Sequence, residues 1–408
     1  MANTIGLKCR ECGREYPLEP LNACDFCFGP LEVMYDYDSI AKVISRKRID
    51  SGPYSLWRYH DLLPAEYHER VDINAGFTPL IRAKNLAQIL GLDELYIKND
   101  SVNPSFSFKD RVVAVASAKA IEFGFDTIAC ASTGNLACSV AAHGARGGIK
   151  ACVFIPAGLE AGKVLGAAIY KPILMSVDGS YDDVNRLCSE LADSYPWAFV
   201  NINMRPFYAE GSKSLGYEVA EQLGWKTPAH VVVPAASGAM FTKIWKGFNE
   251  FADLGIIGPV KTQMHLAQAR GCSPIAEAWK DGRFVIKPVR PNTLATSLAI
   301  GNPADGWYAL KTIEGSDGSA VIAEEDEVAE GVKLLAEAEG IFTEGAGGVA
   351  ISALKHLAES GRIKRDEPTV VYITGNGLKT TELVSDAVNP LQIKSTVSSF
   401  EEAMASRV

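Results

Sequence analysis

Short apolar runs alternate with longer segments of helical periodicity from residue 95 onward. Alternation of this kind predicts an α/β fold in which buried, mostly parallel strands are joined by helices. The strands are expected at Leu95–Lys98, Thr127–Ala131, Ala151–Ile155, Ile173–Val177, Val231–Val233, Thr262–Leu266 and Val370–Thr374. Helices are expected over residues 39–48, 324–339 and 346–359, and the acidic segment 324–339 is expected to present a solvated face.

The chain of 408 residues is long enough for two domains and a small appendage. A net charge of −9 without a basic stripe argues against a nucleic-acid partner. The first residues lack the apolar core of a signal peptide, and no apolar run approaches the roughly 18 residues of a membrane helix. We therefore expect a cytoplasmic protein with no membrane partner.

Four of the nine cysteines form two C-x-x-C pairs, Cys9 with Cys12 and Cys24 with Cys27. Two such pairs have zinc-ribbon spacing and predict a tetrahedral structural zinc site that clips the N-terminus. A reduced or redox-active pair is the alternative. A nucleic-acid-binding ribbon is disfavoured because acidic residues offset the basic ones in this segment. The remaining cysteines are expected to be mostly core residues: Cys130, Cys138, Cys152, Cys188 and Cys272.

A lysine lies at the start of the long apolar segment that follows the first predicted strand, in the stretch Asn103–Arg111. Pro104 disfavours helix before it, and Ser107 with Asp110 approximates a capping box, so the helix is expected to begin at Ser107. Lys109 then lies in the first turn. There the helix dipole, together with burial by the neighbouring phenylalanines, would favour the neutral amine that a nucleophilic lysine needs. The alternative is a surface lysine in a helix cap.

Three strand-to-turn junctions carry small or polar residues where α/β proteins bind ligands. The first, residues 131–136, contains Asn135 after a serine and threonine turn that alternatively only caps a helix. The third, residues 370–379, offers the hydroxyl of Thr374 at the end of a strand. The second offers successive main-chain N–H groups to a phosphate but lacks the P-loop lysine; its residues are Ala235, Ala236, Ser237, Gly238 and Ala239.

These motifs, in this order, resemble those of pyridoxal-phosphate (PLP) enzymes of the tryptophan-synthase β-subunit fold. The sequences SFKDR (107–111) and TGNGLK (374–379) resemble the threonine synthase family in particular, whereas GFTPL (76–80) and the S-x-G-N motif at 132–135 resemble motifs of the PLP enzymes of this fold. The resemblance implies an enzyme that converts O-phospho-L-homoserine and water to L-threonine and phosphate. It also implies a homodimer.

The same resemblance implies PLP fold type II, with two open twisted-sheet domains and the zinc-ribbon-like clip. The clip is expected over residues 1–36, a large domain over 37–83 and 216–408, and a smaller domain over 84–215. Lys109 would be the Schiff-base and catalytic lysine. Asn135 would bond the cofactor's O3′ oxygen, the 235–239 loop its phosphate, and Thr374 its pyridine nitrogen.

Candidate substrate ligands are hydroxyls or cations near these motifs. Glu344 is expected near the pyridine ring or as the cap of the following helix. Gly345 and the pair Ser105-Phe106 depart from the family's usual residues. A relative acting on another phospho- or hydroxy-amino acid, such as a cysteate synthase or threonine dehydratase, and a zinc-ribbon interaction protein that has lost catalysis, are the alternatives. The candidate substrate ligands are Ser105, Arg111, Ser132, Thr133, Lys163 and Arg205.

Overall fold

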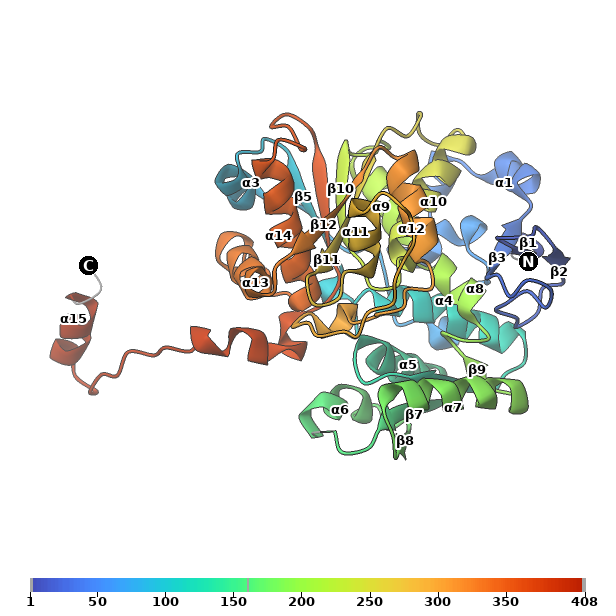
Figure 1. The fold of residues 1–408 in the computed structure, drawn as a ribbon, viewed down its shortest axis with the longest axis horizontal. Helices are drawn as coiled ribbons and strands as arrows, with labels where there is room; N and C mark the ends of the chain where they lie inside the picture. The colour runs from blue at the N-terminus through green and yellow to red at the C-terminus, as the bar shows by residue number, and fades with distance from the viewer. Residues whose placement is uncertain (1–2, 160, 406–408) are drawn as a thin grey trace.

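A six-stranded sheet forms the larger body of the protein in a computed structural model that describes residues 3–159 and 161–405 (Figure 1). The strand order is β12-β11-β10-β13-β5-β4, and every pair is parallel except β4 with β5. The strands are β4 (Leu80–Arg82), β5 (Leu95–Asn99), β10 (His230–Pro234), β11 (Gln263–Ala269), β12 (Ser319–Ala323) and β13 (Thr369–Ile373).

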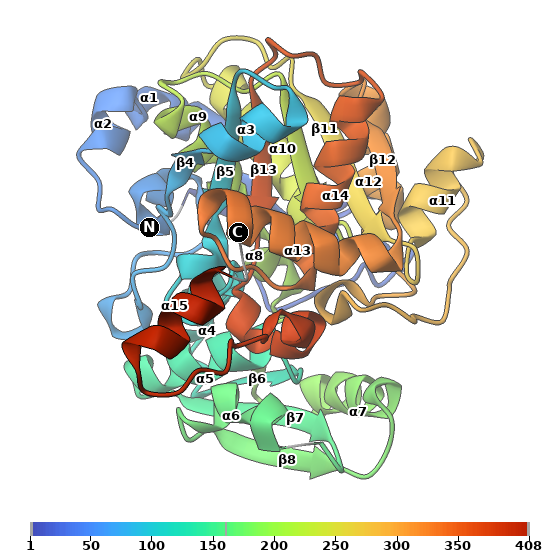
Figure 2. The same ribbon diagram turned by 90° about the vertical axis from the view of Figure 1, so that its left-hand side faces the viewer.

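A second, four-stranded parallel sheet of order β8-β7-β6-β9 forms a smaller body, at the bottom of Figures 1 and 2. Its strands are β6 (Thr127–Ala131), β7 (Lys150–Pro156), β8 (Ile173–Val177) and β9 (Ala198–Phe199). The N-terminal segment adds a small antiparallel sheet of order β2-β1-β3, made of β1 (Thr4–Cys9), β2 (Glu15–Tyr16) and β3 (Leu31–Tyr35). The predicted α/β fold with two open sheets is confirmed.

Helices connect the parallel strands and cover the sheets. Helix α14 packs against β10, β11, β12 and β13, whereas α5 and α7 pack against strands of the smaller sheet. The last helix, α15, stands away from the body at the end of an extended segment (Figure 1). The helices are α1 (Tyr37–Val43), α2 (Arg46–Asp50), α3 (Lys84–Leu90), α4 (Lys109–Glu122), α5 (Asn135–Gly147), α6 (Ala161–Ala168), α7 (Tyr181–Ser194), α8 (Arg205–Glu210), α9 (Lys213–Gln222), α10 (Ala239–Asp253), α11 (Pro274–Lys280), α12 (Gly306–Gly315), α13 (Glu325–Glu339), α14 (Gly345–Glu359) and α15 (Val397–Ala405).

The predicted strands all form, with ends that move by at most a few residues. The expected helix over 39–48 divides into α1 and α2 because Ile44 adopts an extended conformation and the Ser45 side chain starts a new helix by accepting from the Arg48 N–H. The expected domain boundary at residue 84 does not coincide with a division between the two large sheets. Strands β4 and β5 flank this boundary, yet both pair within the six-stranded sheet.

The core follows from the residue types of the central strands. Every residue of β6, β10 and β13 is buried, as expected for parallel strands covered on both faces. None of the helices in the described part of the chain is long and apolar enough to cross a membrane.

Candidate active site

The turn before α4 places the lysine, but the capping box that the sequence suggested does not form. Helix α4 begins at Lys109, and the carboxylate of Asp110 accepts hydrogen bonds from the N–H and the hydroxyl of Ser105. Ser107 does not cap the helix, and its buried hydroxyl finds no partner among the described residues. Phe106 is 51% exposed with a φ of +65°, so it does not bury the lysine. The predicted capping box and the role of Phe106 were therefore wrong.

This lysine turn is joined to the end of β13 by main-chain hydrogen bonds. The Phe108 N–H donates to the Thr374 carbonyl at 2.9 Å, and the Asn376 N–H donates to the Phe106 carbonyl at 3.1 Å. Thr374 is buried. Two motifs more than 260 residues apart in sequence, at 109 and 374, are thus brought to one edge of the six-stranded sheet. This is the carboxyl edge, where parallel sheets place their ligands.

The Lys109 amine faces two aromatic side chains. Its Nζ lies 3.1 Å from the hydroxyl of Tyr208 in α8 and 4.6 Å from the centre of the Phe108 ring. A hydroxyl at this distance can accept a proton from the amine or donate one to it. Tyr208 was not foreseen, since no local motif marks a residue 99 positions away.

A buried carboxylate lies against the side chain of Asn135. Glu344 is 3% exposed, and its carboxylate accepts from the Asn135 side-chain amide at 2.9 Å and from the Ser297 hydroxyl at 3.2 Å. Burial raises its pKa, although hydrogen bonds and nearby lysines oppose the shift. The Glu344 side chain does not cap α14, which excludes the second expected role. Lys379, from the TGNGLK motif, donates to the Asn135 side-chain oxygen at 2.7 Å.

The loop between β10 and α10 presents the expected main-chain N–H groups, with one exception. The Ala235 N–H donates to the Ala267 carbonyl at 2.9 Å and so continues the sheet, which makes Ala235 an unsuitable phosphate ligand. Among residues 3–159 and 161–405, no acceptor bonds the N–H groups of the next four residues, Ala236, Ser237, Gly238 and Ala239. Gly238 has a φ of +93° and precedes the first residue of α10, Ala239. Unpaired amides at a helix N-terminus are suited to bind a phosphate.

Arg111 lies in a different environment from that expected of a substrate ligand. Its side chain is fully buried, and each guanidinium nitrogen donates to protein oxygens, including the carboxylates of Asp100 and Glu218. The nearby carboxylates raise its pKa despite burial. Because its hydrogen-bonding capacity is already used, the expectation that it binds substrate phosphate is wrong on this geometry.

The other substrate candidates lie in separate segments of the chain. The Ser105 hydroxyl is bound to Asp110, and Ser132, at the end of β6, accepts from the Gly134 N–H at 3.3 Å. Thr133, next to it, is half-buried. Arg205, in α8, donates to Asp305 at 2.6 Å. Lys163 belongs to α6, but its side chain lies outside the described residues.

The four N-terminal cysteines converge as predicted. All four sulfur atoms lie within 4.8 Å of one another, with Cys9 and Cys27 at 3.4 Å and Cys12 and Cys24 at 3.6 Å. A tetrahedral site with Zn–S bonds of about 2.3 Å needs sulfur separations of about 3.8 Å, so the arrangement fits zinc. The other five cysteines are buried, as expected.

Comparison with known proteins identifies the family. Residues 71–375 match the family model "Pyridoxal-phosphate dependent enzyme". The chain is 39% identical to threonine synthase of Methanocaldococcus jannaschii over 91% of this chain and 92% of the relative. It is also 39% identical to threonine synthase of Methanosarcina acetivorans over 98% of each chain. The chain belongs to the pyridoxal-phosphate dependent enzymes, within the threonine synthase family.

Solved structures of lower sequence identity share the fold. A processed threonine deaminase from Solanum lycopersicum matches with a TM-score of 0.63 at 19% identity, over 76% of this chain and 88% of that one. Diaminopropionate ammonia lyase from Escherichia coli matches with a TM-score of 0.65 at 20% identity, over 84% and 93%. Both support the assignment to fold type II.

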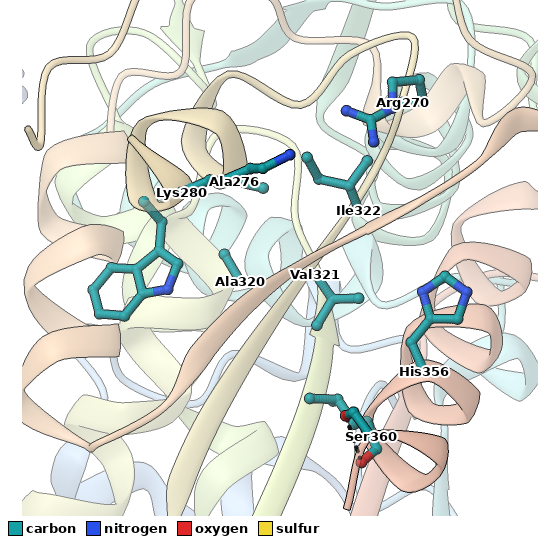
Figure 3. A pocket seen from close by; sticks show the side chains of 10 residues that line it. Arg270, Ala276, Lys280, Ala320, Val321, Ile322, His356 and Ser360 are labelled. Atoms are coloured by element: carbon teal, nitrogen blue, oxygen red, sulfur yellow. Dashed lines mark hydrogen bonds between the residues drawn. The ribbon is translucent and has the colours of Figure 1, made fainter. Parts of the chain in front are cut away.

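The residues of the site fit the cofactor of this family. A lysine amine, a buried threonine and a loop of unpaired main-chain amides meet along one sheet edge, and each suits a different part of PLP. A separate hollow of about 500 Å³ lies between α11, β12 and α14 (Figure 3). Its lining includes Arg270, Trp279 and His356 and contains none of the predicted site residues among those described.

Proposed function

We propose that this protein is a threonine synthase that converts O-phospho-L-homoserine and water to L-threonine and phosphate. The observation that carries the proposal is the identity of 39% to two threonine synthases over more than nine tenths of each chain. The site geometry supports it, because the lysine turn and the TGNGLK motif, which resemble this family most closely, lie against each other.

PLP would be held by residues from three elements. Lys109 would bind it covalently, and Thr374 would hold its pyridine nitrogen. The N–H groups of Ala236, Ser237, Gly238 and Ala239 would bind its phosphate. When bound, the cofactor supplies an electron sink for the pair left when a substrate proton is removed. Asn135 would turn its amide from Glu344 toward the phenolic oxygen.

Lys109 would move the protons of the reaction. Threonine formation requires loss of a proton at Cα and another at Cβ, and cleavage of the Cγ–O bond with departure of hydrogen phosphate. It then requires protonation at Cγ, addition of the hydroxyl of water at Cβ and return of a proton to Cα. The displaced amine of Lys109 would take and return these protons. Tyr208, 3.1 Å away, would hold the amine in place and exchange a proton with it.

The test is phosphate release from O-phosphohomoserine, with amino-acid analysis of the product. The purified holoenzyme should release phosphate and threonine in equal amounts, and Lys109→Ala should release neither. Lys355→Ala, an exposed lysine on α14, is the matched control and should behave as wild type. Phosphate without threonine, or no phosphate despite bound PLP, would favour a relative acting on another phospho- or hydroxy-amino acid. Absence of any PLP absorbance would favour the non-catalytic alternative.

Three further properties are proposed with this function. The cysteines Cys9, Cys12, Cys24 and Cys27 would hold one structural zinc ion, supported by their sulfur separations. A cytoplasmic location and a homodimer are supported by the family alone. Elemental analysis of the purified protein and sedimentation velocity would test the zinc ion and the dimer.

A further inference from the structure

Asp305 connects three parts of the molecule that meet behind the phosphate loop. It precedes α12, and its N–H donates to the Ser237 carbonyl at 3.0 Å. Its own carbonyl lies against Gly238, where an added Cβ would be only 3.0 Å away. The main chain at Asp305 therefore supports the loop whose amides are proposed to bind phosphate.

The carboxylate of Asp305 is shared by two arginines. Arg205 of α8 lies 2.6 Å from one oxygen, and Arg10 lies 3.6 Å from the other. The Asp305 side chain is 10% exposed, which limits screening of both ion pairs by solvent. Helix α8 also carries Tyr208, the partner of Lys109. One carboxylate thus joins the lysine side of the site to the phosphate loop.

Arg10 belongs to the four-cysteine clip, between Cys9 and Cys12. Its N–H donates to the Pro30 carbonyl at 3.0 Å, and its guanidinium lies 3.4 Å from the centre of the Tyr308 ring in α12. The Tyr308 hydroxyl donates to Glu11, the next residue of the clip. The clip therefore contacts Tyr308 in the first turn of α12 and Asp305, which directly precedes this helix.

We propose that Arg10 is a positioning residue for the phosphate loop, acting through Asp305. The clip would then do more than tie down the N-terminus, because it would hold the segment that supports Ser237 and Gly238. Amides that are fixed in advance bind a phosphate more tightly than amides that must be ordered on binding. The inference rests on the proposed cofactor site, because it concerns the phosphate-binding loop.

The test compares PLP with pyridoxal, which lacks the phosphate, as ligands of the apoenzyme measured by absorbance titration. For Arg10→Ala we expect the Kd of PLP to rise about three- to tenfold, the range for residues coupled within one ion-pair network. The Kd of pyridoxal should stay within about twofold, and Arg10→Lys should restore part of the PLP affinity. Arg14→Ala removes another arginine of the clip, paired with Asp25 on the surface, and should change neither Kd.

Asp305→Asn provides a second route to the same result, since it removes both ion pairs and keeps the N–H to Ser237. It should also weaken PLP more than pyridoxal. Equal losses for both ligands would show a merely structural effect and overturn the proposal, and so would unchanged PLP affinity in Arg10→Ala. Failure of the wild-type protein to bind PLP would overturn the proposed function itself, so the two failures are distinguishable.

Discussion

Replacing Glu218 with glutamine should destabilise the protein by removing one carboxylate from the buried ion cluster around Arg111. The Glu218 carboxylate in α9 accepts from Lys98 of β5 at 2.6 Å and from Arg111 of α4 at 2.8 Å. It also accepts from the N–H of Phe77 at 2.6 Å. All of these partners are donors, so the NH₂ group of a glutamine would face other donors. The buried cluster would also gain one uncompensated positive charge.

Two separate arguments give a similar loss in the free energy of unfolding. Removing one partner of a buried ion pair costs about 3–5 kcal/mol of the free energy of unfolding. Burial raises the pKa of Glu218, but Arg111 and Lys98 outweigh it and lower the pKa from 4.5 to about 2. At about 1.4 kcal/mol per unit, that shift corresponds to about 3 kcal/mol. Since the folded pKa is depressed, this stability is present above about pH 4.5 and is lost as the pH falls through 2.

Urea unfolding at pH 7, followed by tryptophan fluorescence and circular dichroism, measures the effect. Coincident transitions would justify a single free energy. Glu314→Gln is the control, since Glu314 pairs with Lys311 on the surface of α12, where both side chains are about half exposed, and it should cost less than about 1 kcal/mol. Adding Lys98→Met to Glu218→Gln should recover part of the loss by removing the excess charge. The reasoning is refuted if Glu218→Gln costs no more than Glu314→Gln.

Three other substitutions test the site and the clip. Tyr208→Phe should lower kcat at least tenfold and leave the Kd of PLP within twofold, because it removes the hydroxyl beside Lys109 and no phosphate ligand. Steady-state kinetics and a PLP titration would measure the two constants. An unchanged kcat would contradict the proton-exchange role. Cys12→Ser should lose the zinc ion, and retention of a full equivalent by elemental analysis would exclude the four-sulfur site. Glu344→Gln should flatten the part of the profile in which the urea midpoint falls as the pH rises above 4.5, the ordinary pKa of a glutamate. Burial raises the Glu344 pKa, so any stability it contributes is lost as the pH rises through the folded pKa, and a profile parallel to wild type would exclude this.

The local sequence was sufficient to predict the elements and sites that a single sequence pattern marks. The apolar runs predicted the parallel strands. A strand covered on both faces must be apolar throughout, and β6, which is buried at every residue, has the predicted ends. Strand β8 also has the predicted ends, although most of its residues are exposed. The paired C-x-x-C motifs likewise predicted a cluster that forms at metal-binding separations. Lys109, Asn135 and Thr374 were singled out because each follows a strand or opens a helix at a position suited to ligands, and their motifs resemble one family.

Tertiary structure decided the roles that depend on long-range partners. Arg111 is two residues from Lys109, yet the carboxylate of Glu218, 107 residues away, makes it a buried ion-pair partner. The amide of Ala235 is used by the neighbouring strand β11, which no local pattern could reveal. Tyr208 and Asp305 lie at the site because α8 and the segment before α12 pack beside it. The sequence by itself determined which residues carry chemical groups at the ends of strands. Only folding determined which of those groups remain free to act, because hydrogen bonds and charges are satisfied by neighbours that sequence spacing does not specify.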